Sequence, residues 1–342
     1  MAYCSSDHSN PAYYRFWDGD MSYADKRPKF GIVLNGGGEY EFGFTEFMKR
    51  CDHGNIVIIN AAETNEDGSY IESSWLYDGV IMEKYRPHSI EHFGIRTKAA
   101  AYDAYLIGRV SMADGIVFGS GDQFKYVQRW KNTPLEQAIN NHVAIGKPIY
   151  GTSAGVAIAS EFVYTGENDS ISSSQAFRDP YYNPTYKYIE GNFHAFTPLK
   201  GYICDTHFAK RDRLGRLLSF IARIVENDSR REIDTFDGQD WHNTFGLGVD
   251  EDGAVIINQD GSATMEGNGA FIIVPKEKKD LNCRPNEDLI ASTFNYYKLV
   301  PGKNFNVIKR RGTYKFKKEI EVYKGVIYYK SVGKWKEMTK RY

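Results

Sequence analysis

One stretch near the middle of the chain, residues 147–159, restricts the fold more than any other. It reads KPIYGTSAGVAIA, which predicts a short apolar strand, a tight turn and a helix of small and aliphatic residues. Gly151 and Gly155 flank Ser153, and because glycine has no Cβ atom, the backbone can reverse sharply on both sides of the serine. The pattern G-x-S-x-G in this setting is typical of an elbow that exposes a serine hydroxyl above the end of a sheet. A simple packed turn is the alternative interpretation.

Buried strands alternate with helices on both sides of this turn. Continuous apolar strands separated by helices predict an α/β fold with a mostly parallel sheet covered by helices on both faces. The functional groups of such sheets gather at the carboxyl ends of the strands. A further strand, or the edge of one, is expected at residues 79–81. The other expected strands lie at residues 30–34, 56–59, 115–118 and from 201 onward, with helices after residue 39, over 97–110 and around 135–139.

The chain divides into three parts. Residues 1–28 lack periodicity and are expected to form an N-terminal arm, whereas residues 29–275 hold the α/β domain. Residues 276–342 are expected to form a β-rich extension, because tyrosine, isoleucine and valine alternate with lysine there. The segment 309–342 contains 12 Lys and Arg against 3 Glu, so the extension is basic. A solvated sheet face is favoured there over a site for a polyanion.

Composition argues against several function classes. The formal net charge of -1 gives the whole molecule no bias toward nucleic acids or acidic membranes. Four widely separated cysteines, Cys4, Cys51, Cys204 and Cys283, favour neither a zinc site nor a disulfide scaffold. No run of about 18 apolar residues is present, so no membrane-spanning helix is expected. We therefore expect a cytoplasmic protein that needs no metal or cofactor and binds neither nucleic acid nor membrane.

Three glycine-rich turns follow expected strands: NGGGE at 35–39, GSGDQ at 119–123 and GTSAG at 151–155. Such turns often bind phosphate, but none of these matches G-x-G-x-x-G or a Walker sequence with its lysine. Close packing of the backbone around the serine is the preferred interpretation. We expect the N–H groups of Gly121 and Ala154 to form an oxyanion hole beside the serine.

A serine on such a turn needs a base, and His207 is the best candidate among the eight histidines. It ends a different strand, beside Asp205, so both strand ends are expected to point to the same face. A helix is expected over residues 211–225, with Arg213 inside its apolar arc and Arg216 at one edge. An arginine in that position needs a carboxylate, from the protein or from a ligand, because an unpaired buried charge is too costly.

Three motifs in this order resemble those of cyanophycinases and their relatives in the peptidase E family of serine peptidases. They are GSGDQ (119–123), GTSAG (151–155) and DTHFAKRDRLGRL (205–217). With the NGGGE turn and the GVDED segment near Asp250, the resemblance covers about residues 29–275.

The resemblance implies an α/β sandwich similar to class I glutamine amidotransferases and to flavodoxin, with Ser153 as nucleophile and His207 as base. Cyanophycinases release β-aspartyl-arginine units from the end of a polymer, and peptidase E relatives cleave after an N-terminal aspartate. The implied activity is therefore that of a serine exopeptidase or isopeptidase for aspartyl peptides, and a homodimer is compatible with it. The implied substrate pocket consists of Asp122, Gln123, Asp205, Thr206, Arg211, Arg213 and Arg216.

Two positions depart from the cyanophycinase pattern. Thr206 stands where cyanophycinases carry glutamine, which leaves the identity of the polymer open. The third catalytic member is expected in the loop after the elbow helix, where the aligned position holds Gln175. An amide can hold the tautomer of the imidazole but cannot stabilise the imidazolium by charge. Glu167 and Asp169 are the alternatives in the same loop.

Two other functions are compatible with parts of the sequence. If neither acid serves, the chain is a catalytically weak or inactive binding module on the same fold. A glutamine amidotransferase is disfavoured, because such enzymes carry cysteine where this chain has Ser153.

Overall fold

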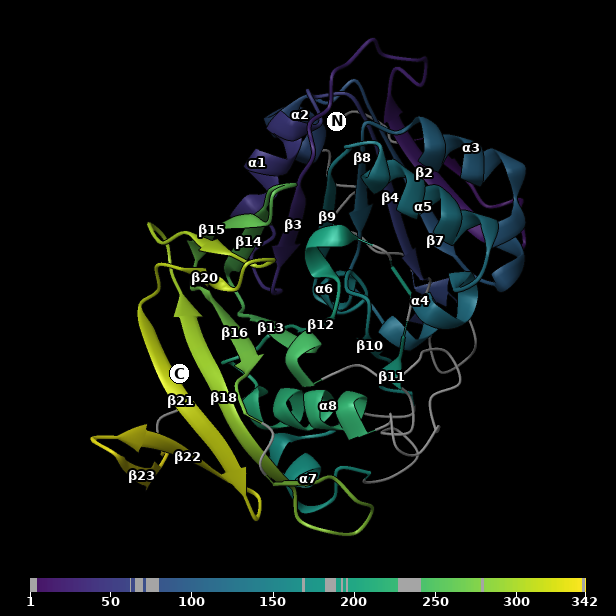
Figure 1. Cartoon of the computed structure of the whole chain (residues 1–342). Coiled ribbons are helices and arrows are strands. Elements are labelled where there is room, and N and C mark those ends of the chain that lie inside the picture. Colours follow the sequence, from purple (N-terminus) through teal and green to yellow (C-terminus); the bar gives the residue numbers. More distant parts are fainter. Residues whose placement is uncertain are drawn as a thin grey trace.

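The structure is a computed structural model that describes residues 5–61, 63–64, 70–71, 80–167, 170–181, 189–191, 193–194, 196–226, 241–277, 280–339 and 342. Its two large β-sheets occupy the upper and the lower left part of Figure 1, and each has helices packed on it.

The first sheet has 11 strands in the order β1-β2-β7-β4-β8-β9-β3-β14-β15-β19-β20. Its five central strands, β7, β4, β8, β9 and β3, are mutually parallel, whereas the strands outside them pair antiparallel. The bounds are β1 Ser5–Asp7, β2 Tyr13–Gly19, β3 Ile32–Asn35, β4 Asn55–Ala61, β7 Ser89–Ile95, β8 Gly115–Phe118, β9 Ile149–Thr152, β14 Gly253–Ile257, β15 Ser262–Gly267, β19 Phe305–Asn306 and β20 Arg311–Gly312.

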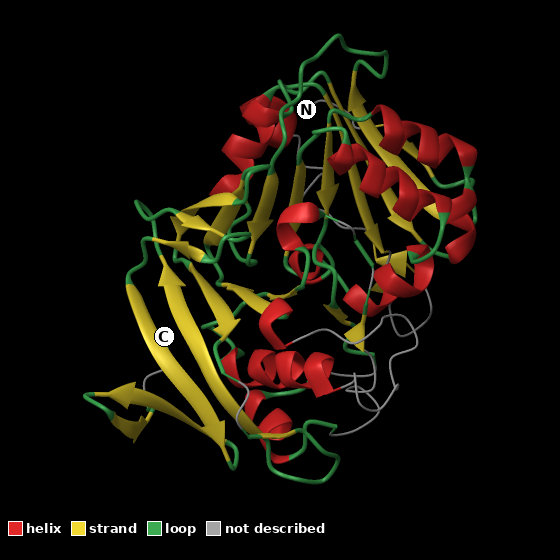
Figure 2. Ribbon diagram, in the orientation of Figure 1, coloured by secondary structure: helices red, strands yellow, loops and turns green. Residues whose placement is uncertain are grey.

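Helices cover both faces of this parallel core (Figure 2). Because successive strand residues point to opposite faces, Ile58 packs with α1 and α2, whereas Ile59 packs with α3, α4 and α5. Asp103, Asp122 and Thr133 accept amide hydrogen bonds as the N-caps of α3, α4 and α5. The helices are α1 Glu41–Arg50, α2 Val80–Tyr85, α3 Ala104–Met112, α4 Gln123–Trp130, α5 Pro134–Ala144, α6 Ala154–Ala157, α7 Ser173–Arg178 and α8 Leu214–Glu226, with short 3-10 helices at Lys98–Tyr102, Thr197–Leu199 and Trp241–Asn243.

The second sheet has the order β12-β13-β16-β18-β21-β22-β23, with β17 paired to β18. Only its first pair, β12 and β13, is parallel. The helices α7 and α8 pack on it through a separate apolar cluster that includes Phe177, Leu217 and Phe294. The bounds are β12 Tyr202–Asp205, β13 Phe245–Val249, β16 Ala270–Pro275, β17 Leu281–Asn282, β18 Ile290–Leu299, β21 Phe316–Tyr323, β22 Val326–Ser331 and β23 Lys334–Glu337. Two small sheets pair β5 Glu63–Thr64 with β6 Tyr70–Ile71 and β10 Val163–Tyr164 with β11 Ile189–Glu190.

The two terminal segments share sheets with the expected α/β domain. The strand β18 of the extension pairs with β16 from Ala270↔Leu299 to Pro275↔Phe294, so strands continue one sheet across residue 275. In the expected N-terminal arm, β2 pairs along the whole of β7, and its Tyr14 is fully buried. A β-rich extension is present as expected, but it widens both sheets.

The expected α/β fold is therefore confirmed for the parallel centre of the first sheet, which has helices on both faces. The first sheet is mixed, with a parallel centre and antiparallel margins, and a second, mainly antiparallel sheet lies beside it. The strand expected at 79–81 is wrong: Val80 begins helix α2, in which Ile81 and Tyr85 share one buried face, and Gly79 lies outside the described residues. Among the described residues, no helix is long and apolar enough to cross a bilayer.

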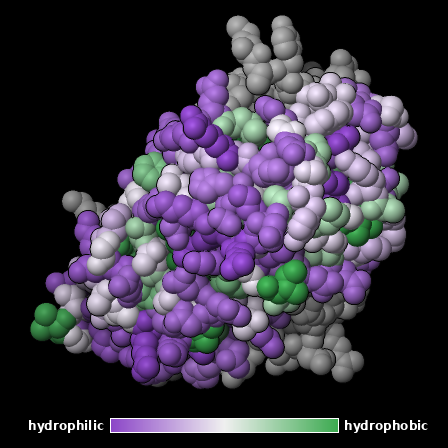
Figure 3. Space-filling view, turned by 90° about the horizontal axis from the view of Figure 1, so that it is seen from above, coloured by the Kyte–Doolittle hydropathy of each residue, from purple (hydrophilic) through white to green (hydrophobic). Residues whose placement is uncertain are grey.

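Seen from above, the surface is mainly hydrophilic, and apolar residues are scattered over it singly (Figure 3). Exposed apolar side chains of this kind are normal for a folded domain.

Candidate active site

Ser153 lies at the turn between β9 and the short helix α6. Its backbone adopts φ 51° and ψ -114°, a region that non-glycine residues seldom occupy. The flanking glycines are required by space: a Cβ atom on Gly155 would lie 2.4 Å from the carbonyl oxygen of Phe118, and one on Gly151 would lie 2.6 Å from that of Gly155. The Ser153 amide also donates to the Asn35 carbonyl at 3.1 Å. The turn is thus held tightly and presents the serine to a cavity.

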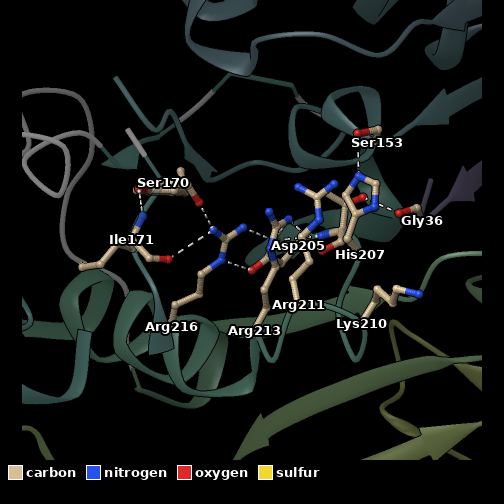
Figure 4. A network of polar contacts seen from close by, with 12 residues as sticks. Gly36, Ser153, Ser170, Ile171, Asp205, His207, Lys210, Arg211, Arg213 and Arg216 are labelled. Carbon is tan, nitrogen blue, oxygen red and sulfur yellow. Dashed lines mark hydrogen bonds and ion pairs between the residues drawn. The ribbon is translucent and has the colours of Figure 1, made fainter. Parts of the chain in front are cut away.

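His207 follows β12 of the second sheet and faces the serine. Its Nε2 atom lies 2.9 Å from the Ser153 Oγ atom, and Figure 4 shows the two side chains pointing at one another. The His207 amide donates to the Gly36 carbonyl at 2.9 Å, which ties the histidine to the first sheet. The carboxyl ends of β9 and β12 therefore meet, as predicted, although the two strands belong to different sheets.

The NGGGE turn packs against both of these residues. Gly37 has φ 101°, and a Cβ atom there would lie 2.2 Å from the His207 Cε1 atom. The Asn35 Oδ1 atom accepts from the Gly37 amide and from the Thr152 Oγ1 atom, both at 3.0 Å. Glycine at this position allows the backbone to approach the imidazole face directly.

Glu251 contacts the other nitrogen of the imidazole. Its Oε1 atom lies 2.7 Å from the His207 Nδ1 atom, and 23% of its side chain is exposed. Glu251 sits on the turn between β13, which is the parallel neighbour of β12, and β14 of the first sheet. A serine, a histidine and a carboxylate are therefore joined in series, the arrangement used for nucleophilic catalysis by serine hydrolases.

The expectation that Gln175 would be the third member of this series is wrong. Gln175 lies in the first turn of α7, where its Oε1 atom accepts from the Ser172 amide at 2.9 Å and from the Ser172 Oγ atom at 2.7 Å, forming a capping box. Its side chain is occupied by the helix terminus. Of the two alternatives, Asp169 lies outside the described residues, and among the described residues Glu251, not Glu167, is the acid on His207.

The electrostatic setting favours a neutral imidazole. Burial lowers the pKa of His207 below its usual value, the hydrogen bond to Glu251 opposes this shift, and the charges of Arg211 and Arg213 add to it. A neutral imidazole can accept the serine proton. Asp250 orders the loop that follows the histidine, since its Oδ1 atom accepts from the amides of Ala209 and Lys210 at 3.0 and 3.1 Å.

Gly121 and Ala154 both line the same cavity. Gly121 has φ 133° and lies in the turn after β8, whereas Ala154 begins α6 directly after the serine. Within the described part of the chain, neither amide donates a hydrogen bond to the protein. Two such N–H groups beside a nucleophile can donate hydrogen bonds to an oxyanion as it develops.

Asp205 and two arginines form a buried ion-pair cluster beside the histidine. The Arg216 Nε and Nη2 atoms lie 2.7 and 2.5 Å from the two carboxylate oxygens of Asp205, and the Arg213 Nη1 atom lies 3.2 Å from its Oδ1 atom. Burial raises the pKa of Asp205, but the charges of Arg216 and Arg213, together with the hydrogen bonds from Arg216 and the Thr206 amide, outweigh burial and lower it overall. Burial also lowers the pKa of Arg213 to about 10, so the guanidinium stays charged at neutral pH.

The expected helix over 211–225 begins only at Leu214, so Arg213 precedes it. Arg213 also donates to the Thr206 carbonyl at 2.8 Å, while Arg211 is 54% exposed with its Nε atom 3.9 Å from Glu251. In Figure 4, Arg213 and Arg216 point toward Asp205 and Arg211 rises beside His207. Counting Asp205 and Glu251, three guanidinium groups face two carboxylates, which leaves the site cationic.

A cavity of about 280 Å³ connects these groups. This volume is near the lower end for small-molecule sites, roughly 300–1,000 Å³. Asp122 is not among the lining residues, because its carboxylate caps α4 through the Phe124 amide at 2.9 Å. Tyr164 was not anticipated and lines the cavity with its ring 5.4 Å from the Arg216 guanidinium. The predicted residues that line the cavity are Gly121, Gln123, Ser153, Ala154, Asp205, Thr206, His207, Arg211, Arg213 and Arg216.

Comparison with known proteins assigns the family. The model of peptidase family S51 matches residues 43–228, which is more than half of the chain. The chain belongs to peptidase family S51. It is a serine-type peptidase related to the cyanophycinases, as the three sequence motifs implied.

Individual relatives of this S51 peptidase are distant. A cyanophycinase from Trichormus variabilis is 23% identical over 67% of this chain and 69% of its own length. One from Synechococcus elongatus is 26% identical over 52% of this chain and 46% of its own length. A solved structure, a peptidase from an acI-B1 Actinobacterium, superposes with a TM-score of 0.52 at 16% identity, covering 81% of this chain and 97% of that one. At this identity, the structural likeness supports the fold alone.

Proposed function

We propose that this chain hydrolyses aspartyl peptides through an acyl-enzyme on Ser153. The observation that carries the proposal is the series of contacts from Ser153 Oγ through the His207 imidazole to Glu251, placed in a cavity with a cationic wall.

In the first step, the Ser153 Oγ atom attacks the carbonyl carbon of the scissile bond while the His207 Nε2 atom takes the hydroxyl proton. The Gly121 and Ala154 amides donate to the oxyanion of the tetrahedral intermediate. Glu251 stabilises the imidazolium, which then gives its proton to the leaving amine as the C–N bond breaks. A water molecule attacks the acyl-enzyme with His207 again as base, and this releases the acid and restores the serine.

The substrate class follows from the charge of the cavity. Arg213 and the largely exposed Arg211 border the space in front of the nucleophile, and a substrate carboxylate would pair with a guanidinium there. Relatives of this chain are named cyanophycinases. The resemblance described above implies β-aspartyl-arginine units as the substrate of such enzymes. An aspartyl residue in this cavity agrees with both observations.

The alternative, an inactive binding module, was suggested by the amide of Gln175. A carboxylate beside His207 removes that reason.

The test is hydrolysis of soluble cyanophycin, of short β-aspartyl-arginine oligomers and of Asp-X peptides, followed by mass spectrometry of the products. Ser153→Ala is expected to lower turnover at least about 10³-fold. Ser111→Ala is the matched control, since Ser111 is exposed on α3 and, among the described residues, its hydroxyl bonds only the Ile107 carbonyl. Undiminished turnover in Ser153→Ala would refute the serine mechanism, and cleavage of neutral peptides alone would refute the aspartyl substrate.

A further inference from the structure

A second cavity lies next to the one that holds Ser153. It measures about 430 Å³ and is bordered by α7, by the loop at Arg211 and Asp212, and by the turn between β21 and β22. The family match ends at residue 228, so the β21–β22 turn is contributed by a part of the chain outside it. This cavity is therefore a joint product of the peptidase domain and the β-rich extension.

The β21–β22 turn is fixed against α7 by the backbone. The Leu289 amide donates to the Phe177 carbonyl at 2.7 Å, and the Gly325 amide donates to the Leu289 carbonyl at 3.3 Å. Gly325 lies so close that a Cβ atom there would meet the Phe177 Cβ atom at 3.3 Å. The wall formed by the extension is thus built into the fold.

Arg211 borders both cavities. The loop that carries it is anchored from both sides, because the Asp212 carbonyl accepts from the Ser173 Oγ atom and the Asp212 carboxylate accepts from the Tyr342 hydroxyl at 2.9 Å. Because Arg211 lines both cavities, a chain that extends from Ser153 along its guanidinium would reach the second cavity.

The second cavity carries charges of both signs. Arg178 and Lys324 supply cations beside Arg211, and Asp212 and Asp288 supply carboxylates. Arg178, Lys324 and Asp288 are exposed, and none of them forms an ion pair with another described residue. A uniformly anionic or uniformly cationic ligand would meet like charges here, whereas a segment with a carboxylate and a guanidinium in each unit finds partners for both.

We propose that this second cavity is a subsite that binds a neighbouring, doubly charged unit of an aspartyl peptide while another unit lies before Ser153. The proposal rests on the proposed function and adds to it that the extension selects long, mixed-charge substrates over short ones. The subsite itself makes and breaks no bonds.

Calorimetric titration of the full-length Ser153→Ala chain tests this. A single β-aspartyl-arginine unit and a four-unit oligomer are compared, and the ratio of their dissociation constants gives the gain from length. In the background of Ser153→Ala, the pair Arg178→Gln and Lys324→Asn is expected to lower that gain about five- to tenfold while leaving the affinity of the single unit unchanged. Asparagine suits Lys324 because φ is 48° there.

Lys334→Asn and Arg284→Gln are the matched controls, since both residues are exposed on the extension outside the cavity. They are expected to leave the gain from length unchanged. An equal gain in the cavity variants and the parent, or an equal loss for the single unit and the oligomer, would overturn the subsite alone, provided that the wild type cleaves the oligomer. If the wild type cleaves no aspartyl peptide, the proposed function fails and the subsite fails with it.

Discussion

The Glu251 Oε1 atom lies 2.7 Å from the His207 Nδ1 atom, on the opposite side of the imidazole from the Ser153 hydroxyl. This contact places a charge where the sequence predicted an amide. It fixes the tautomer that leaves Nε2 free to accept the serine proton, and it offers a counter-charge to the imidazolium.

Glu251→Gln is expected to lower kcat about 10²- to 10⁴-fold with little change in KM, because the amide keeps the size of the side chain but not its charge. Steady-state kinetics on an aspartyl peptide measure this. A loss in kcat/KM that comes from KM alone would assign Glu251 to substrate binding.

Gln175→Ala is expected to cost about 1 kcal/mol in the free energy of unfolding, since it removes one half of the capping box of α7. Chemical denaturation measures the cost. The kcat of the folded enzyme should stay unchanged, and Gln175→Glu should bring no gain. A tenfold rise in Gln175→Glu would reinstate this position as the relay.

In the proposed mechanism the neutral form of His207 accepts the serine proton, so the acidic limb of the pH profile of kcat/KM should report the protonation of His207. Activity rises as pH increases through the pKa of His207, which lies below its usual value. Arg211 lowers this pKa and Glu251 raises it, so Arg211→Gln should move the limb to higher pH and Glu251→Gln to lower pH. Lys210, which points away from the site in Figure 4, is the control through Lys210→Gln. Shifts in the same direction for both variants would contradict this electrostatic account.

Gly37→Ala is expected to displace the His207 imidazole and to lower kcat about 10²-fold, because the new methyl group would occupy the place of the ring. Activity per folded molecule, with folding followed by circular dichroism, separates this loss from instability. Gly108→Ala is the contrasting variant: nothing lies within 4 Å of a Cβ atom there, and in helix α3 the change should stabilise by about 0.5–1 kcal/mol. Full activity in Gly37→Ala would contradict the close approach.

Asp205→Asn is expected to cost about 3–5 kcal/mol in the free energy of unfolding, because it leaves Arg213 and Arg216 buried without their counter-charge. The pKa of Asp205 is lowered in the folded state, so its contribution is complete at neutral pH and is lost only as pH falls through that lowered value. The difference between wild type and variant should therefore narrow only below about pH 4. A constant difference down to pH 2 would contradict the charge pairing.

The sequence was most informative where function depends on neighbouring residues. Ser153 with its two glycines, and His207 with the arginines that follow it, are local patterns, and they could be placed from spacing alone. The alternation of apolar strands also predicted the parallel centre of the first sheet. It could not predict the second sheet, because periodicity says where a strand lies but not which strand it pairs with.

Glu251 was missed for the same reason. It lies 44 positions after His207, and only the parallel pairing of β12 with β13 brings the two together. The GVDED segment held a usable signal, since three acids follow a buried strand there, but the resemblance pointed to the loop after the elbow, where Gln175 lies. Asp122 was expected in the substrate pocket, but an aspartate directly before a helix can cap it, and Asp122 caps α4 through the Phe124 amide.

The turn that carries Glu251 is also where the chain leaves the second sheet at β13 and enters the first at β14. The serine belongs to one sheet, the histidine to the other, and the acid to the crossing between them. The proposed activity therefore depends on how the two sheets are docked against each other. Under mild denaturant we expect hydrolysis to cease once the sheets separate, before either sheet has lost its own strands.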